Sequence, residues 1–325
     1  MWVGLVALLP LLVPQDDEEF VLSRLYVATS TGAYVSYSWG EQWQPVGDPP
    51  SSKIRVFTCL GPQVFAGGAD GMFFSNDYGV NWTRMEGWNG GEVVTILTSS
   101  YYGAEPTLFA GTTEGLFRSR DAGDQWERLG EGIITGMVHD LAWPGPSVFA
   151  ATSEGLFFSE DGGDDWVKLE EGLPGGALLS LATSSYFPQE PTAFVGSDRA
   201  GIFQTHDGGE TFTALDGPAG REAKVYSLFW WRASFFAGTD SGLFVSHDAG
   251  ESWSSASTEL EGRKVYRILI PAPDSPVGSD IIVGTDKGVF KSSDGALSWR
   301  HLTDGLGEPE ILGFGSFPIV QWDQQ

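Results

Sequence analysis

Cysteine and basic residues are scarce in this chain of 325 residues. Cys59 is the one cysteine, which excludes a disulfide within the chain and leaves the redox compartment undecided. The 18 lysines and arginines stand against 43 aspartates and glutamates, giving a net charge of −25. Because such a charge repels phosphate, it excludes a nucleic-acid backbone or an anionic membrane surface as a partner.

Sustained helical periodicity is also missing, and the apolar run at the N-terminus is too short to cross a bilayer. Residues 1–19 consist of this run and an acidic stretch, and they lack the basic start and cleavage site of a good export signal. An inner strand and a degenerate export signal both remain open for them. Short strand patterns, aromatic and β-branched residues and 44 glycines indicate an all-β protein.

A motif of the form Ser-x-Asp-x-Gly-x-x-Trp recurs at intervals of roughly 40 residues. Four copies are complete and three differ at one or two positions, and the copies span Ser36–Trp43, Ser75–Trp82, Ser119–Trp126, Ser159–Trp166, Thr205–Phe212, Ser246–Trp253 and Ser292–Trp299. A carboxylate at the third position can accept backbone N–H groups of its own turn, and the glycine permits a positive φ. We predict a structural role for Asp77, Asp121, Asp161, Asp207, Asp248 and Asp294. Each copy offers too few oxygen ligands for calcium, so no metal is expected.

Each repeat also carries an apolar strand, a second strand ending in a glycine-containing turn, a third strand, and a short fourth strand after the tryptophan. Seven such units predict a seven-bladed β-propeller of four-stranded antiparallel blades over residues 20–318, followed by a tail at 319–325. Ile311 to Phe317 reads as an eighth first strand with no second strand after it. We expect it to join the strands that begin near Leu25 and so close the ring through the two termini.

The Ser-x-Asp-x-Gly-x-x-Trp turns preceded by Gly-Leu-Phe resemble the bacterial neuraminidase repeat, or Asp-box, superfamily over about residues 20–318. That superfamily includes sialidases, xyloglucanases, sortilin-type receptors and a photosystem II assembly factor family, which share a scaffold more than a function. The resemblance implies a propeller and slightly favours a location outside the cytoplasm. Its assembly-factor members imply a protein partner, although the arginine-rich patch expected of them is not obvious among 12 scattered arginines.

Enzymatic members of the superfamily match less well. A sialidase needs three arginines for the substrate carboxylate, but Arg55 and Arg267 in predicted first strands have no third equivalent. Phosphate-binding, metalloprotease and serine-hydrolase motifs are absent, so no catalytic, cofactor-binding or metal residue is expected. The sequence favours a non-catalytic binding or scaffolding module. The alternatives are a glycoside hydrolase or sialidase-like enzyme, or a glycan-binding propeller.

Two sets of loop residues are candidates for a binding surface. Loops after the first strands are rich in aromatic residues, namely Tyr101, Tyr102, Trp143, Tyr186, Phe187, Trp230 and Trp231. Exposed aromatics on a rigid rim suit a protein or glycan partner, but these could equally cover blade edges. Turns on the opposite face carry Asp70, Glu114, Glu154, Asp198, Asp240 and Asp286. We interpret these as polar turn residues, with a cation-binding ring as the alternative.

Overall fold

The structure is a computed structural model that describes residues 24–47, 53–60, 62–99, 106–184, 190–217, 220, 222–231, 234–270 and 280–316. All regular elements among these residues are β-strands. None of the described residues forms a helix that could cross a membrane. The segments 1–19 and 319–325 lie outside the described residues.

Seven sheets of four strands make up the fold. Blade 1 contains β28 (Ile311–Ser316), β1 (Leu25–Thr29), β2 (Gly32–Ser36) and β3 (Gln44–Pro45). Blade 2 contains β4 (Ile54–Leu60), β5 (Gln63–Gly68), β6 (Gly71–Ser75) and β7 (Thr83–Arg84). Blade 3 contains β8 (Val93–Thr98), β9 (Leu108–Thr112), β10 (Gly115–Ser119) and β11 (Glu127–Leu129). Blade 4 contains β12 (Val138–Ala142), β13 (Val148–Thr152), β14 (Gly155–Ser159) and β15 (Val167–Leu169).

The remaining three blades follow the same plan. Blade 5 contains β16 (Leu178–Thr183), β17 (Ala193–Ser197), β18 (Ile202–Thr205) and β19 (Thr213–Ala214). Blade 6 contains β20 (Val225–Trp231), β21 (Ser234–Thr239), β22 (Leu243–Ser246) and β23 (Ser254–Ser255). Blade 7 contains β24 (Val265–Leu269), β25 (Ile281–Thr285), β26 (Gly288–Ser292) and β27 (Arg300–Leu302).

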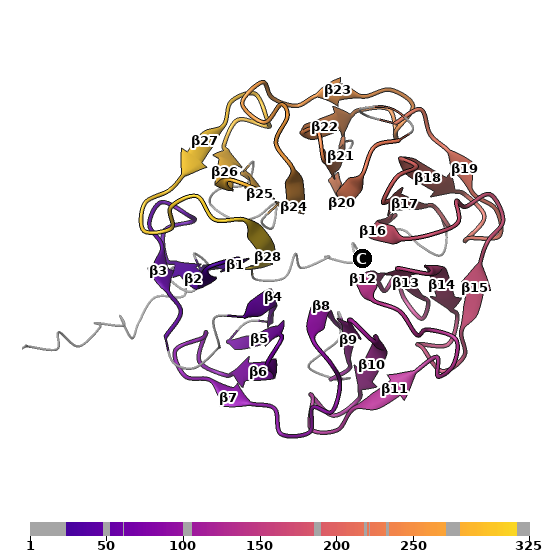
Figure 1. The fold of residues 1–325 in the computed structure, drawn as a ribbon, viewed down its shortest axis with the longest axis horizontal. Helices are drawn as coiled ribbons and strands as arrows, with labels where there is room; N and C mark the ends of the chain where they lie inside the picture. Colours follow the sequence, from indigo (N-terminus) through magenta and orange to yellow (C-terminus); the bar gives the residue numbers. More distant parts are fainter. Residues whose placement is uncertain are drawn as a thin grey trace, which may run out of the picture.

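The blades are arranged as a ring, with the first strand of each nearest the central axis and the fourth at the periphery (Figure 1). Neighbouring strands are antiparallel throughout. In blade 1 the innermost strand, β28, comes from the C-terminal end of the chain and pairs with β1. The predicted seven-bladed propeller, closed by strands from the two ends, is therefore confirmed.

Hydrophobic cores fill the spaces between adjacent blades. Second strands such as β9 and β13 are buried along their whole length, and β5 and β21 are buried after their first residue, because a blade covers each of their faces. One core joins Phe109 and Leu116 of blade 3 to Val138, Phe157 and Trp166 of blade 4. Packing of this kind continues around the ring, so each blade is supported by both of its neighbours.

A second repeated turn joins the second and third strands of most blades. In blade 3 the Thr112 hydroxyl donates to the carbonyl of Gly115 at 2.8 Å and accepts the backbone N–H of Glu114 at 3.1 Å. Gly115 has a φ of 139°, which a side chain would resist. The same side-chain bond forms at Thr29, Thr152, Thr239 and Thr285. These turns lie at the end of the ring where the innermost strands begin.

Candidate functional site at the propeller axis

Every innermost strand contains a β-bulge near its start. The pairing register with the neighbouring strand skips one residue in each case. The skipped residues, hereafter the bulge residues, are Arg55, Val94, His139, Leu179, Tyr226, Tyr266 and Leu312. A bulge places two residues opposite one on the partner strand and re-aims their side chains.

The consequence is visible in the burial of strand β24. Val265 and Ile268 are buried, whereas the consecutive residues Tyr266 and Arg267 are both half-buried. An undistorted strand would alternate between its two faces, so adjacent residues would not share an environment. The bulge thus gives a strand two neighbouring side chains on the side of the central axis.

All seven bulge residues line one cavity of about 250 Å³ on the axis, which we call the axial pocket. Its other lining residues are Met137, Lys224, Arg267, Glu310 and Ile311. It lies at the end of the ring where the innermost strands begin, which is also the end of the second-to-third turns. Of the predicted aromatic rim, the described residues Trp143, Trp230 and Trp231 lie at or after the far ends of their first strands, toward the opposite end of the ring.

One side of the axial pocket is aromatic and charged. Tyr226 and Tyr266 pack edge to face, with ring centroids 4.9 Å apart. The Lys224 ammonium lies 5.3 Å from the centre of the Tyr226 ring and forms an ion pair with Asp198. Burial raises the pKa of Tyr266, and its hydrogen bond to Glu310 adds to this effect. Blades 6 and 7, together with the residue before β28, therefore supply most of the polar groups.

Arg267 of β24 in blade 7 is a charged group that lines the axial pocket. Its Nη1 donates to the carbonyl of Tyr266 at 3.0 Å. Burial lowers the pKa of Arg267, and the charge of Asp140 in β12 opposes this shift. Burial raises the pKa of Asp140 to about 6, although its two oxygens accept the backbone N–H groups of Leu141 and Leu181, each at 2.9 Å. Both groups are thus held in surroundings that disfavour charge.

Aliphatic residues line the axial pocket at positions spread around the ring. Val94, Leu179 and Leu312 come from blades 3, 5 and 1, and Met137 and Ile311 lie beside them. His139 of blade 4 lies between Val94 and Leu179 in the order of the ring. Burial, followed by the charges of Arg267 and Lys224, lowers the pKa of His139. The seven-fold repeat of the backbone therefore carries a strongly asymmetric set of side chains.

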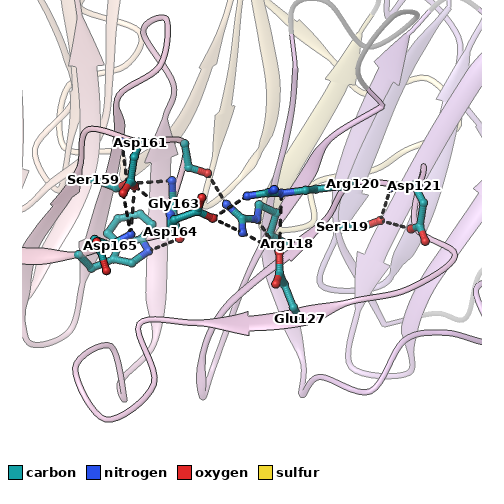
Figure 2. Close-up of polar contacts among 12 residues, drawn as sticks. Arg118, Ser119, Arg120, Asp121, Glu127, Ser159, Asp161, Gly163, Asp164 and Asp165 are labelled. Atoms are coloured by element: carbon teal, nitrogen blue, oxygen red, sulfur yellow. Dashed lines mark hydrogen bonds and ion pairs between the residues drawn. The ribbon is translucent and has the colours of Figure 1, made fainter.

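The Ser-x-Asp turns lie away from this pocket and use their polar groups within the turn. The Ser159 hydroxyl donates to Asp161 at 2.7 Å and accepts the N–H of Gly163 at 2.8 Å (Figure 2). Asp161 accepts the N–H groups of Asp164 and Asp165 at 2.9 and 3.0 Å. Equivalent bonds form at Asp77, Asp121, Asp207, Asp248 and Asp294. These contacts support the structural role predicted for the six aspartates.

A buried arginine connects two of these turns across a blade boundary (Figure 2). Arg118 of β10 donates from Nε to Glu127 at 2.8 Å, from Nη1 to the Gly162 carbonyl at 2.7 Å and from Nη2 to Asp164 at 2.6 Å. Arg120 reaches the same Asp164 oxygen from the solvent side at 2.5 Å. Blades 3 and 4 are joined by this network in addition to their apolar core.

The predicted aromatic rim is only partly described. Tyr101, Tyr102, Tyr186 and Phe187 lie outside the described residues. Trp143 is half-buried, with its ring 4.9 Å from that of Phe109, and Trp230 packs against Phe194 and Phe235. Trp231 packs against the core between blades 6 and 7. The proposed binding role of the rim stays a prediction.

The predicted acidic turn residues have polar partners in several blades. Asp70 pairs with Lys53, Asp198 with Lys224, and Glu154 accepts the Thr135 hydroxyl at 2.9 Å. Among the described residues, no group of three or more acidic, histidine or cysteine side chains is arranged to hold a metal ion. These contacts favour the interpretation as polar turn residues.

Sequence reasoning missed the axial pocket. From the sequence, Arg55 and Arg267 are first-strand residues that form only an incomplete arginine triad. A usable signal is the spacing of apolar residues: Val265 and Ile268, or Val138 and Leu141, are three apart where a regular strand would space them by two.

Comparisons with known proteins identify the fold. No protein-family model and no curated protein sequence matches this chain. YCF48 bound to D1 peptide is similar with a TM-score of 0.65 and 18% identity, covering 87% of this chain and 91% of YCF48. The GH74 xyloglucanase from Xanthomonas campestris has a TM-score of 0.62 and 15% identity, covering 81% of this chain and 47% of the xyloglucanase.

The extracellular domain of BT4673 from B. thetaiotaomicron has a TM-score of 0.64 and 15% identity over 79% of this chain. This chain spans only 34% of that domain's length. At such identities the likeness shows a shared β-propeller fold. Both enzymes and binding proteins are among these similar structures.

Proposed function

We propose that this chain is a non-catalytic member of the Asp-box propeller superfamily that binds a protein partner at the axial pocket. The observation that carries the proposal is the convergence of all seven bulge residues on one cavity. Each of these residues sits on a strand that is paired with its blade, so its backbone loses little freedom on binding.

The superfamily assignment is supported by the hydrogen bonding of the turns. Serine, aspartate, glycine and tryptophan each make a repeated contact, and the Trp166 indole donates to the Gly163 carbonyl at 2.9 Å. The motif therefore works as one local unit, which is how a sequence signature can persist on a scaffold with many functions.

The carboxylates near the axis support binding over catalysis. Of the described residues that line the pocket, Glu310 is the one carboxylate, and it accepts the Tyr266 hydroxyl. Asp140 uses both oxygens to hold backbone N–H groups. Most glycoside hydrolases need two carboxylates that flank the scissile bond, one as acid and one as base or nucleophile.

A protein partner is favoured over a glycan by the size of the pocket and by one similar structure. A cavity of about 250 Å³ is below the ~300–1,000 Å³ of most small-molecule clefts, so it suits one anchoring group of a larger partner. YCF48, which resembles this chain over most of both lengths, has been solved with a bound D1 peptide.

Affinity capture from the native host, with matched variants, tests the proposal. Leu179→Asp places a charge in the lining of the axial pocket, and Val167→Asp places the same charge on the exposed outer strand β15. We expect a partner that is retained by the parent and by Val167→Asp but lost by Leu179→Asp, with both variants folded by circular dichroism. Equal retention by all three proteins would contradict the assignment of the site.

A panel of fluorogenic glycosides tests the non-catalytic part. We expect no turnover by the purified protein. Turnover that disappears in Glu310→Gln would show that the axial pocket is an active site.

A further inference from the structure

The cations of the axial pocket differ in how they are neutralised. Arg55 forms an ion pair with Glu92, and Lys224 forms one with Asp198. Arg267 donates to a backbone carbonyl, and no carboxylate of the described residues lies within the 4.0 Å of an ion pair. A guanidinium has five N–H donors, so its single bond to an acceptor of the described residues leaves donors that can face a ligand in the pocket.

The surroundings of Arg267 make it a strong site for an anion. Arg267 is half-buried, lines the axial pocket and directly follows the bulge residue Tyr266. Guanidinium groups bind carboxylates through two parallel hydrogen bonds, and these strengthen where water is partly excluded. The Tyr226 and Tyr266 rings and the Lys224 ammonium lie on the same side, so polar recognition is concentrated there.

The aliphatic lining residues of the pocket indicate the chemistry of the rest of the ligand. Val94, Leu179 and Leu312 offer no hydrogen bonds, so they favour a hydrocarbon group. At ~30 Å³ per water-sized unit, a cavity of about 250 Å³ holds roughly eight heavy atoms. A branched aliphatic chain with one carboxylate is of this size, whereas an oligosaccharide is much larger.

We propose that the axial pocket binds an aliphatic carboxylate, with the carboxylate on Arg267 and the hydrocarbon against aliphatic lining residues that include Leu179. This inference rests on the function proposed above and specifies the chemistry that the pocket recognises. The group can be the C-terminal residue of a polypeptide that ends in an aliphatic side chain, or a small free carboxylic acid.

Calorimetric titration with three small probes tests the charge preference. The probes are 4-methylvalerate, its primary amide and isoamylamine, which share a branched chain. We expect the acid to bind and the amide and amine to bind at least ~10-fold more weakly, the equivalent of ~1.4 kcal/mol. Binding of the amine in preference to the acid would overturn the inference, as would the absence of acid binding at millimolar concentration.

Variants locate the binding. Arg267→Gln should lower the affinity for 4-methylvalerate at least ~10-fold, and Arg267→Lys should retain part of that affinity. Arg120→Gln is the same change on an exposed arginine away from the pocket, and it should leave the affinity for 4-methylvalerate unchanged. Leu179→Asn should weaken 4-methylvalerate but not acetate, because acetate lacks the branched chain. Equal affinity of the parent and Arg267→Gln, with both folded, would refute the role of Arg267.

A pair of peptides distinguishes the two sources of the carboxylate. Acetyl-Gly-Gly-Leu with a free C-terminus should bind more tightly than 4-methylvalerate if the ligand is a polypeptide end, and its C-terminal amide should not bind. Tighter binding of 4-methylvalerate than of the peptide would instead identify the ligand as a small free carboxylic acid. If no carboxylate binds while the protein partner is still lost in Leu179→Asp, this inference fails and the proposed function stands.

Discussion

The Arg118 network offers the sharpest test of how the blades are held together. Arg118 and Arg120 both bond to Asp164 of the next blade, but the Arg118 side chain is 4% exposed and that of Arg120 is 58% exposed. Changing each to methionine removes the same charge and keeps an unbranched apolar stem. The two variants therefore differ mainly in the burial of the interaction that they remove.

The expected magnitudes follow from that difference. Arg118→Met removes three hydrogen bonds from a charged donor, each worth ~1.5–3 kcal/mol when its partners stay buried. Glu127 and Asp164 are half-exposed, so water replaces much of what they lose. We expect a net loss of about 2 kcal/mol in the free energy of unfolding. Arg120→Met should cost less than ~0.5 kcal/mol, as exposed ion pairs usually do.

Urea denaturation followed by tryptophan fluorescence measures both losses. The ratio of the two losses in the free energy of unfolding is more informative than either loss alone, because the extrapolation to zero urea affects both variants in the same way. If Arg120→Met destabilises the protein as much as Arg118→Met, burial is not what gives the inter-blade network its strength.

Three further predictions concern closure and turns. Deleting residues 309–325 removes β28, exposes the edge of β1 and should cause aggregation, whereas deleting 317–325 retains β28 and should leave a soluble protein by size-exclusion chromatography. Gly163→Ala should lower the free energy of unfolding, measured by thermal unfolding, by about 1–2 kcal/mol, since Gly163 has a φ of 96° and an added Cβ would lie 3.0 Å from Phe109. Gly162→Ala should lower it less, since no atom lies within 4 Å of a Cβ added there and alanine occupies that turn position at Ala122 and Ala249. Asp161→Ala should lower the melting temperature at neutral pH. The N–H of Asp165 and the Ser159 hydroxyl hold the pKa of Asp161 below its ordinary value of 3.8. The higher melting temperature of the parent should therefore be present above pH 3.8, and its difference from the variant should shrink as the pH falls below that value. A constant difference in melting temperature down to about pH 2 would contradict this role.

The sequence was informative where structure depends on local bonds. Ser159, Asp161 and Trp166 lie within eight residues and satisfy one another, so each turn could be recognised alone and the blades counted. Closure could also be predicted, because Ile311 follows Trp299 at the interval seen in other repeats and no second strand follows it in the sequence.

The axial pocket depends on contacts between distant repeats, which one repeat does not reveal. A bulge is a property of pairing between two strands, and Tyr226 meets Tyr266 only because blades 6 and 7 pack against each other. The same limit applies to Arg118, whose partners are 9, 44 and 46 residues away. The matching position holds Val35, Phe74 and Phe158 in three other blades, and Lys291 of blade 7 forms an ion pair there with Asp280 of its own blade. The sequence pattern therefore does not predict a network between blades.

Site-specific photo-crosslinking tests the central claim most directly, because it places the partner at one end of the ring or the other. A benzophenone amino acid replaces Tyr226 in the axial pocket in one protein and Tyr101 in the predicted aromatic rim in a second, and each is irradiated with the captured partner. We expect a crosslinked complex from position 226 and none from position 101. A crosslink from position 101 alone would place the partner on the rim and contradict the assignment of the axial pocket.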